Sequence, residues 1–202
     1  MNPRIYSPQP IGRGVSRRGF FDSSGQVFLS AGAVALLAGC AGNAATPMSS
    51  SSAQNDVAIL NVALGLEHEA IAAYQLGAES KLLEKPVLDV AVLFQTHHKE
   101  HRDALAATVR KLGGRPVEPK TMNDYATALN ASAIKSQGDI LKLAARLERG
   151  AANAYLGVIP SFKDAELAKV AGRLAADETM HWTALAGALK ENLPAKALSF
   201  AA

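Results

Sequence analysis

The chain has 202 residues, a formal net charge of +3 and a single cysteine. One cysteine excludes a disulfide framework within the chain and a thiolate-ligated zinc or iron–sulfur site. Residues 1–39 hold four of the 21 basic residues and one of the 18 acidic residues, so 17 of each remain and the rest of the chain has no net charge. The basic excess therefore belongs to the N-terminus, and no nucleic acid is expected as a partner.

The first 39 residues have the pattern of an export signal. Arg17 and Arg18 precede an uncharged stretch over 27–39, which resembles a twin-arginine signal. This stretch is too short to span a bilayer comfortably, which argues against a permanent transmembrane helix. A Leu-Ala-Gly-Cys sequence ending at Cys40 resembles a bacterial lipobox and predicts cleavage before Cys40, with lipid on its sulfur. Ordinary signal-peptidase cleavage after Cys40 is the alternative interpretation.

These features predict an envelope protein on the periplasmic side of a bacterial membrane, exported by the twin-arginine route and anchored by its lipid. Residues 40–55 are small and polar and show no periodicity, so we expect a flexible tether there. The 147 residues of 56–202 are enough for one domain with a single hydrophobic core.

Apolar residues recur at helical spacing through this domain, and no stretch alternates with the period of a strand. Pro86 suits the first turn of a helix, and the two glycines at 113–114 suit a helix end. Pro160 would end the third helix, and Ser161-x-x-Asp164 resembles a capping box that opens the fourth. The fold class is all-α, with helices predicted over 56–83, 86–112, 139–159 and 161–190.

Short connections join the first predicted helix to the second and the third to the fourth, so each pair forms an antiparallel hairpin. A much longer segment, 113–138, joins the two hairpins, and a short helix is expected within it around 125–131. A connection of this length can cross the whole bundle. The sequence therefore predicts a four-helix bundle of two antiparallel hairpins joined by one long crossover.

The two predicted hairpins carry the same motif. The pattern Leu-Glu-x-x-Ala-x-x-Ala-Tyr at 66–74 recurs 81 residues later at 147–155. His98-x-x-His101 corresponds in the same way to Glu178-x-x-His181, 80 residues later. A repeat of fixed period indicates one supersecondary unit built twice and packed against itself.

Side chains that bind metals recur within this repeat, with one glutamate on the first helix of each hairpin and an i, i+3 pair on the second. A rise of ~1.5 Å per residue places them within a few ångströms of one level of the bundle. Buried carboxylates cost free energy unless a cation pairs with them, and glutamate with some histidine suits iron, manganese or zinc. The candidate metal ligands are Glu67, His98, His101, Glu148, Glu178 and His181.

Over about 56–190 the chain resembles the ferritin-like superfamily, which includes rubrerythrins, bacterioferritins and manganese catalases. The resemblance implies a ferritin-like four-helix bundle in which two single glutamates and two Glu-x-x-His pairs hold two iron or manganese ions. The matching positions are Glu67 and Glu148 for the single glutamates, Glu178 and His181 for one pair, and His101 for the histidine of the other.

The chain departs from the family pattern at His98, where the family has a glutamate that bridges the two metals. One imidazole does not readily replace that bridge, and three carboxylates then face two divalent ions. A shifted register, Gln95-x-x-His98, also lacks the carboxylate. A mononuclear site, an altered dinuclear site and a vestigial site all remain open.

Each candidate also has a simpler interpretation. Glu178 and His181 could be a solvated pair, and the histidines at 97, 98 and 101 could lie on the surface. Tyr74 and Tyr155 are expected in the core, with a hydrogen bond to a ligand carboxylate as the alternative. The remaining assignments are His97 as a ligand or an outer partner, Trp182 as packing, and His68, Glu69 and Glu100 as solvated neighbours.

Two functions compete. The first is an envelope-anchored ferritin-like protein that binds one or two ions of iron or manganese, with redox or peroxide chemistry as its activity; no catalytic residue is assigned. The second is a non-enzymatic, lipid-anchored helical bundle, a stress or scaffold protein with a vestigial metal site. Partners expected for either are the membrane, through the lipid, and further copies of the chain.

Overall fold

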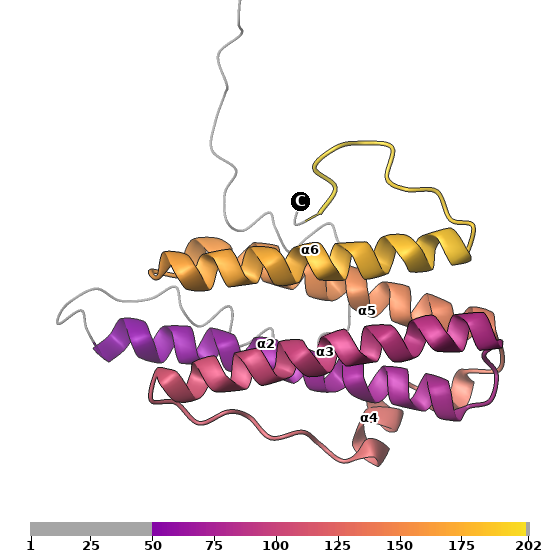
Figure 1. Cartoon of the computed structure of the whole chain (residues 1–202), viewed down its shortest axis with the longest axis horizontal. Coiled ribbons are helices and arrows are strands. Elements are labelled where there is room, and N and C mark those ends of the chain that lie inside the picture. Colours follow the sequence, from indigo (N-terminus) through magenta and orange to yellow (C-terminus); the bar gives the residue numbers. More distant parts are fainter. Residues whose placement is uncertain (1–49, 201–202) are drawn as a thin grey trace, which may run out of the picture.

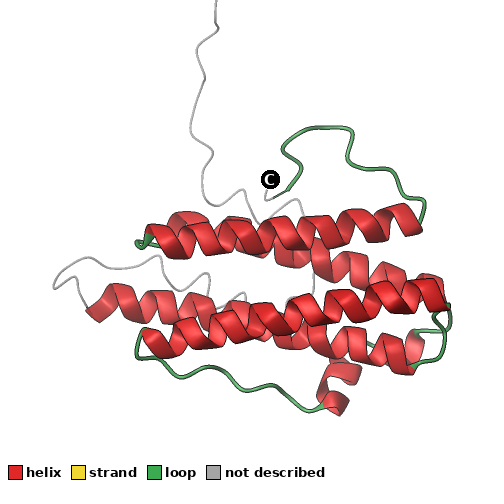
Figure 2. Ribbon diagram, viewed as in Figure 1, coloured by secondary structure: helices red, strands yellow, loops and turns green. Residues whose placement is uncertain are grey.

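The computed structural model describes residues 50–200, and this part of the chain is helical with no strand (Figure 2). The prediction of an all-α fold is confirmed. The predicted signal peptide over 1–39, Cys40 and residues 41–49 of the predicted tether lie outside the described residues. The elements are α2 (Ser50–Glu79), α3 (Lys85–Lys111), α4 (Met122–Ala128), the 3-10 turn η2 (Ala131–Ala133), α5 (Gln137–Val158), the 3-10 turn η3 (Ile159–Ser161) and α6 (Ala165–Ala188).

Four long helices form the bundle, as two antiparallel hairpins that lie side by side (Figure 1). Helix α2 packs along α3, and α5 packs along α6, with short turns between the members of each pair. The segment after α3 runs back along the outside of the first hairpin to α4 and then joins α5. The predicted topology, two hairpins and one long crossover, is the one observed.

Helix α2 begins at Ser50, six residues before the predicted start at 56. Residues 50–55 are therefore helical, although the sequence analysis assigns them to the tether. Ala53 and Gln54 are good helix formers, and neither proline nor glycine interrupts the chain between Ser50 and Gly65. Residues 50–55 are polar, but they contain no residue that stops a helix.

The predicted capping box at Ser161 and Asp164 is wrong. Ser161 is the last residue of η3, a turn that accommodates Pro160 near its start. Asp164 is itself the N-cap of α6, and its side chain accepts a hydrogen bond from the backbone N–H of Glu166. A capping box does occur in the crossover, where Thr121 and Asp124 open α4 three residues before the short helix predicted there.

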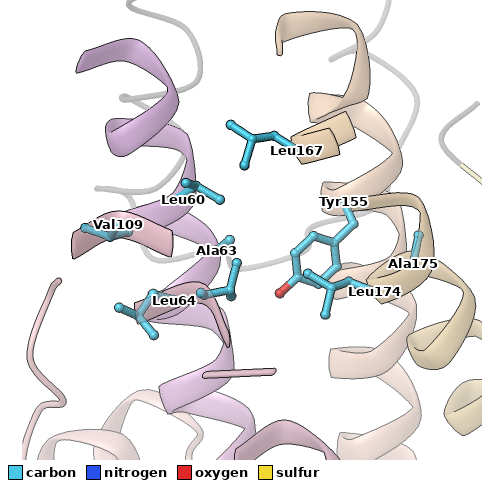
Figure 3. Close-up of a cluster of buried hydrophobic side chains, with 9 residues drawn as sticks. Leu60, Ala63, Leu64, Val109, Tyr155, Leu167, Leu174 and Ala175 are labelled. Carbon is cyan, nitrogen blue, oxygen red and sulfur yellow. The ribbon is translucent and has the colours of Figure 1, made fainter. Parts of the chain in front are cut away.

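Two apolar layers fill the bundle, and a polar layer separates them. Leu60, Leu64 and Tyr155 belong to the first apolar layer, which Figure 3 shows between α2 on one side and α5 and α6 on the other. Tyr74 and Trp182 belong to the second layer. On α2 the buried Glu67 lies between Leu64 and Tyr74, so the polar layer is closed above and below by hydrophobic side chains.

Helix α2 is the most apolar element, and its Ser52–Glu79 segment is long and hydrophobic enough to cross a membrane, with a hydropathy of 1.2. Half of its most hydrophobic stretch is buried inside the bundle. Its apolar residues pack against α3 and α5, as expected for a core helix, which accounts for its hydropathy.

Candidate metal centre

The structure brings all six predicted ligands together in the polar layer. One glutamate comes from α2 and one from α5, and an i, i+3 pair comes from each of α3 and α6. All six side chains are buried, and even the most exposed of them, His101, is only 9% exposed. The alternatives that placed these residues on the surface are wrong.

The six residues form two overlapping groups, each with ligand atoms within 4.8 Å of one another. The members of the first group are Glu67, His98, His101 and Glu178, and those of the second are His98, Glu148, Glu178 and His181. His98 and Glu178 belong to both groups. The polar layer therefore offers two adjacent positions, each of which could hold a metal ion, and two side chains are common to them.

His98 spans both groups with its two ring nitrogens. Nδ1 lies 2.8 Å from Oε2 of Glu67, and Nε2 lies 3.1 Å from Oε1 of Glu148. Both nitrogens can donate hydrogen bonds only when the ring is protonated. Burial would lower the pKa of His98, but the hydrogen bonds to Glu148 and Glu67 outweigh it and hold the pKa well above its ordinary value. In the metal-free protein His98 is therefore a cation between two carboxylates.

Glu178 belongs to both groups and makes no hydrogen bond with another described residue. Its Oε1 is 3.3 Å from Nδ1 of His101, and its Oε2 is 3.3 Å from Nδ1 of His181. Neither oxygen of Glu178, nor Nδ1 of His101, makes a hydrogen bond of good geometry among the described residues. Burial raises the pKa of Glu178 to about 6, although His101 and His181 oppose this shift.

These unsatisfied atoms fit a divalent cation. Buried polar atoms are nearly always hydrogen-bonded in native proteins, so three unsatisfied atoms at one point call for a ligand. The donors are carboxylate oxygens and imidazole nitrogens, which suit iron and manganese. The Glu178 carboxylate presents one oxygen to each group, as a ligand shared by two cations would.

Two tyrosines hold the single glutamates from the opposite hairpin. Tyr74 on α2 donates a hydrogen bond to Oε1 of Glu148, and Tyr155 on α5 donates one to Oε1 of Glu67. Burial and the nearby carboxylates raise the pKa of both tyrosines well above 10, so both remain protonated donors. These tyrosines are core residues that also orient candidate ligands, which combines the two interpretations drawn from the sequence.

His101 and His181 each belong to one group only, and we call them the terminal histidines. Each ring has a contact at the nitrogen that faces away from its group. Nε2 of His181 lies 2.9 Å from Nδ1 of His97, and Phe94 stacks on the His181 ring with centroids 4.1 Å apart. Nε2 of His101 lies 3.2 Å from Oδ2 of Asp177. Both histidines thus turn Nδ1 toward Glu178, and His97 is an outer partner outside both groups.

Asp177 is a residue that the sequence analysis missed. It precedes Glu178 on α6, and its side chain reaches across to His101 on α3. A carboxylate next to a ligand glutamate was the only indication in the sequence, and it did not say which way the side chain would turn.

The alternative register of the second helix is wrong. The Gln95 amide donates hydrogen bonds to the carbonyl of Ile71 and to the side chain of Gln75, away from the two groups. Trp182 packs against Phe200 and under the guanidinium of Arg149, so its assignment as packing is confirmed.

Comparisons with known proteins agree with this fold. A family model described as a ferritin-like domain matches residues 55–191. The crystal structure of a conserved hypothetical protein from Mycobacterium tuberculosis is similar, with a TM-score of 0.58 and 22% identity over 74% of this chain and 99% of that chain. At this identity the likeness shows the fold alone. A comparison with curated proteins finds no match.

Proposed function

Because the chain belongs to the ferritin-like domain family, we propose that it binds two divalent cations, iron or manganese, in its bundle core. The observation that carries this proposal is the pair of overlapping groups that share His98 and Glu178. Glu67 and His101 complete one position, and Glu148 and His181 complete the other. Bound iron or manganese would supply redox chemistry, and we propose peroxide as its substrate class.

The chain's own residues bind and orient in this proposal. Tyr155 and Tyr74 fix the carboxylates of Glu67 and Glu148, and Asp177 and His97 fix the rings of the two terminal histidines. The apolar layers on either side limit the access of bulk water. A cation therefore meets ligands whose direction is already set, so little conformational entropy is lost on binding.

A non-enzymatic bundle with a vestigial site is the second candidate, and His98 favours it. As a protonated ring between Glu67 and Glu148, His98 supplies the positive charge that a metal would otherwise supply. The bundle core is then electrostatically balanced without a metal. Such a protein would be an anchored scaffold or stress protein.

Metal analysis separates the two candidates. The domain is purified without chelator from its own export route, and its iron and manganese are measured per chain. Two ions per chain are expected for the metal-binding function. A metal-free domain that also fails to take up Mn²⁺ or anaerobic Fe²⁺ would establish the scaffold instead.

We expect the effect of metal on stability to grow with pH. The pKa of His98 is raised well above its ordinary value, and the pKa of His101 is raised to about 10. Both histidines therefore stabilise the metal-free fold fully below about pH 6.5, the pKa of a histidine in the unfolded chain. This stabilisation is lost as the pH rises through the pKa values of the folded protein. The pKa of Glu178, raised to about 6, acts in the same direction. The pKa values of Glu67 and Glu148 are lowered, so the two ionised carboxylates stabilise the fold above about pH 4.5. This stabilisation is lost only as the pH falls below that value.

Each histidine must lose its proton to bind a cation, so metal binds more tightly as the pH rises. Above about pH 6.5 bound metal therefore adds stability over the range in which the metal-free protein loses it. Thermal melts in chelator should therefore show the highest melting temperature at mildly acidic pH. The increase on adding Mn²⁺ should be small near pH 5.5 and several degrees near pH 8. An increase of the same size at both pH values would contradict the protonated histidines described above.

We also propose that Cys40 carries a lipid and that the protein is exported by the twin-arginine route to the periplasmic side of the envelope. The support is the sequence around Arg17, Arg18 and Cys40. Cells grown with labelled palmitate should label the wild-type protein but not Cys40→Ala, which should still be exported. Replacing Arg17 and Arg18 together with lysine should block export. A wild-type protein without label would leave an unanchored periplasmic domain.

A further inference from the structure

A cavity of about 370 Å³ connects the protein surface with the polar layer. It lies between α2, α5 and the end of α4, and both charged and apolar side chains line it. Its outer wall includes the exposed residues Asn130 and Arg146, and its inner wall includes the buried side chains of His98 and Glu148. Its wall is mostly apolar but includes Glu69, His98 and Glu148, and a cavity of this volume with polar groups in its wall has room for several water molecules around an ion.

Glu69 lines this cavity two residues after the candidate ligand Glu67. It is partly buried, and its carboxylate makes no hydrogen bond and no ion pair with another described residue, although Lys120 and Arg146 are its charged neighbours. Glu67, by contrast, accepts a hydrogen bond from Tyr155 and contacts His98. Burial raises the pKa of Glu69, and the charges of Lys120 and Arg146 only partly offset this, since neither makes an ion pair with it among the described residues. A partly desolvated carboxylate without a cation in contact favours binding one.

We propose that this cavity is the entrance through which hydrated divalent cations reach the metal centre, and that Glu69 is the carboxylate that first binds them. The inference rests on the proposed metal-binding function and adds a path to it. A cation held at Glu69 is within the same cavity as Glu148 and His98, which can then replace its water molecules. Glu69, expected from the sequence to be a solvated neighbour of Glu67, is partly buried in the wall of this cavity.

A second cavity near the metal centre does not suit a cation. It has a volume of about 220 Å³, and its walls are almost entirely apolar, with Val87, Leu141 and Leu185 among them. It reaches Tyr74 and Phe94 but includes no charged side chain. A hydrated ion would lose its water there without gaining a ligand, so the two cavities differ in what they can admit.

Neutralising the negative and the positive side chain at the entrance should change the rate of metal uptake in opposite directions. Arg146 is an exposed cation at the outer wall, and it opposes the approach of a divalent ion. Glu69→Gln should therefore slow metal uptake, and Arg146→Gln should speed it. We expect changes of about threefold to tenfold at low ionic strength, which shrink as salt is added.

The test follows Co²⁺ uptake by the metal-free protein, from the visible absorption of the bound ion in a stopped-flow instrument. Glu79→Gln and Arg173→Gln are matched controls, because each makes the same change of charge at an exposed helical residue that lines neither cavity. Ala128→Trp, at the exposed rim of the entrance, tests the path by steric obstruction and should also slow uptake. Ala176→Trp, at an exposed position on α6, is its control.

The final absorbance in the same experiment gives the amount of Co²⁺ bound per chain, which tests the proposed function separately. If the wild type binds Co²⁺ and both Glu69→Gln and Glu79→Gln take it up at the wild-type rate, the proposed entrance is wrong and the metal centre stands. Equal slowing by these two variants would show an effect of net charge alone and would also overturn it. A wild-type protein that binds no Co²⁺ would overturn both proposals.

Discussion

Glu178→Ala is expected to abolish cation binding at both positions of the metal centre. Glu178 is the carboxylate that both groups share, with one oxygen directed toward His101 and the other toward His181. Glu67→Ala and Glu148→Ala should each remove one position, because each of these residues belongs to a single group. Removing an outer partner of a metal ligand typically lowers affinity about 10- to 100-fold, so losing a shared ligand should cost more.

Metal titrations of the purified domain, with metal analysis after desalting, measure this difference. Glu100→Ala, an exposed carboxylate on the same helix as His98, is the control and should keep both ions. Glu178 is also paired with His98, His101 and His181, so its removal should lower the stability of the metal-free domain, and circular dichroism at low temperature checks that the variant is folded before metal is added. Equal metal content and affinity in Glu178→Ala and the wild type would disprove the site.

His98→Glu should make folding of the domain depend on metal. In the metal-free protein it replaces a cation, held between Glu67 and Glu148, with a fourth carboxylate beside Glu178. Removing one partner of a buried ion pair typically costs about 3–5 kcal/mol, and the added negative charge increases this. The same change adds a carboxylate that both groups could share, so the second cation should bind more tightly than in the wild type.

Urea unfolding of His98→Glu in chelator and in Mn²⁺ measures both effects. His98→Gln is the matched control, because it removes the positive charge without adding a negative one and can still donate a hydrogen bond. It should be less destabilised in chelator and less stabilised by Mn²⁺. If His98→Glu were as stable as the wild type in chelator, the protonated ring would not be what balances the two glutamates.

The fold and the six converging side chains could be predicted because both depend on periodicity. Helical rise alone fixes the level of Glu67, His98 and Glu178 along the bundle, and the repeat shows which faces point inward. The helical rise does not determine how each imidazole ring is oriented. Whether His97 binds a metal or supports His181 depends on rotation about two helix axes and on side-chain rotamers.

The features that the sequence did not show depend on contacts between elements distant in the chain. The contact of Asp177 with His101 joins α6 to α3. The cavity at Glu69 exists because the crossover places the end of α4 beside α2 and α5. The sequence pattern alone does not locate a helix start, since Thr121-x-x-Asp124 and Ser161-x-x-Asp164 share it and only the first forms a capping box.

The tyrosine–glutamate pairs also determine how the hairpins align along the bundle axis. Tyr74 reaches from the first hairpin to Glu148 in the second, and Tyr155 reaches back from the second to Glu67 in the first. Sliding one hairpin by a single helical turn, ~5.4 Å, would break both bonds and leave two buried carboxylates without their donors. The contacts of His98 with Glu148 and of His101 with Asp177, which also join the two hairpins, would break in the same slide, so the polar layer as a whole favours one alignment.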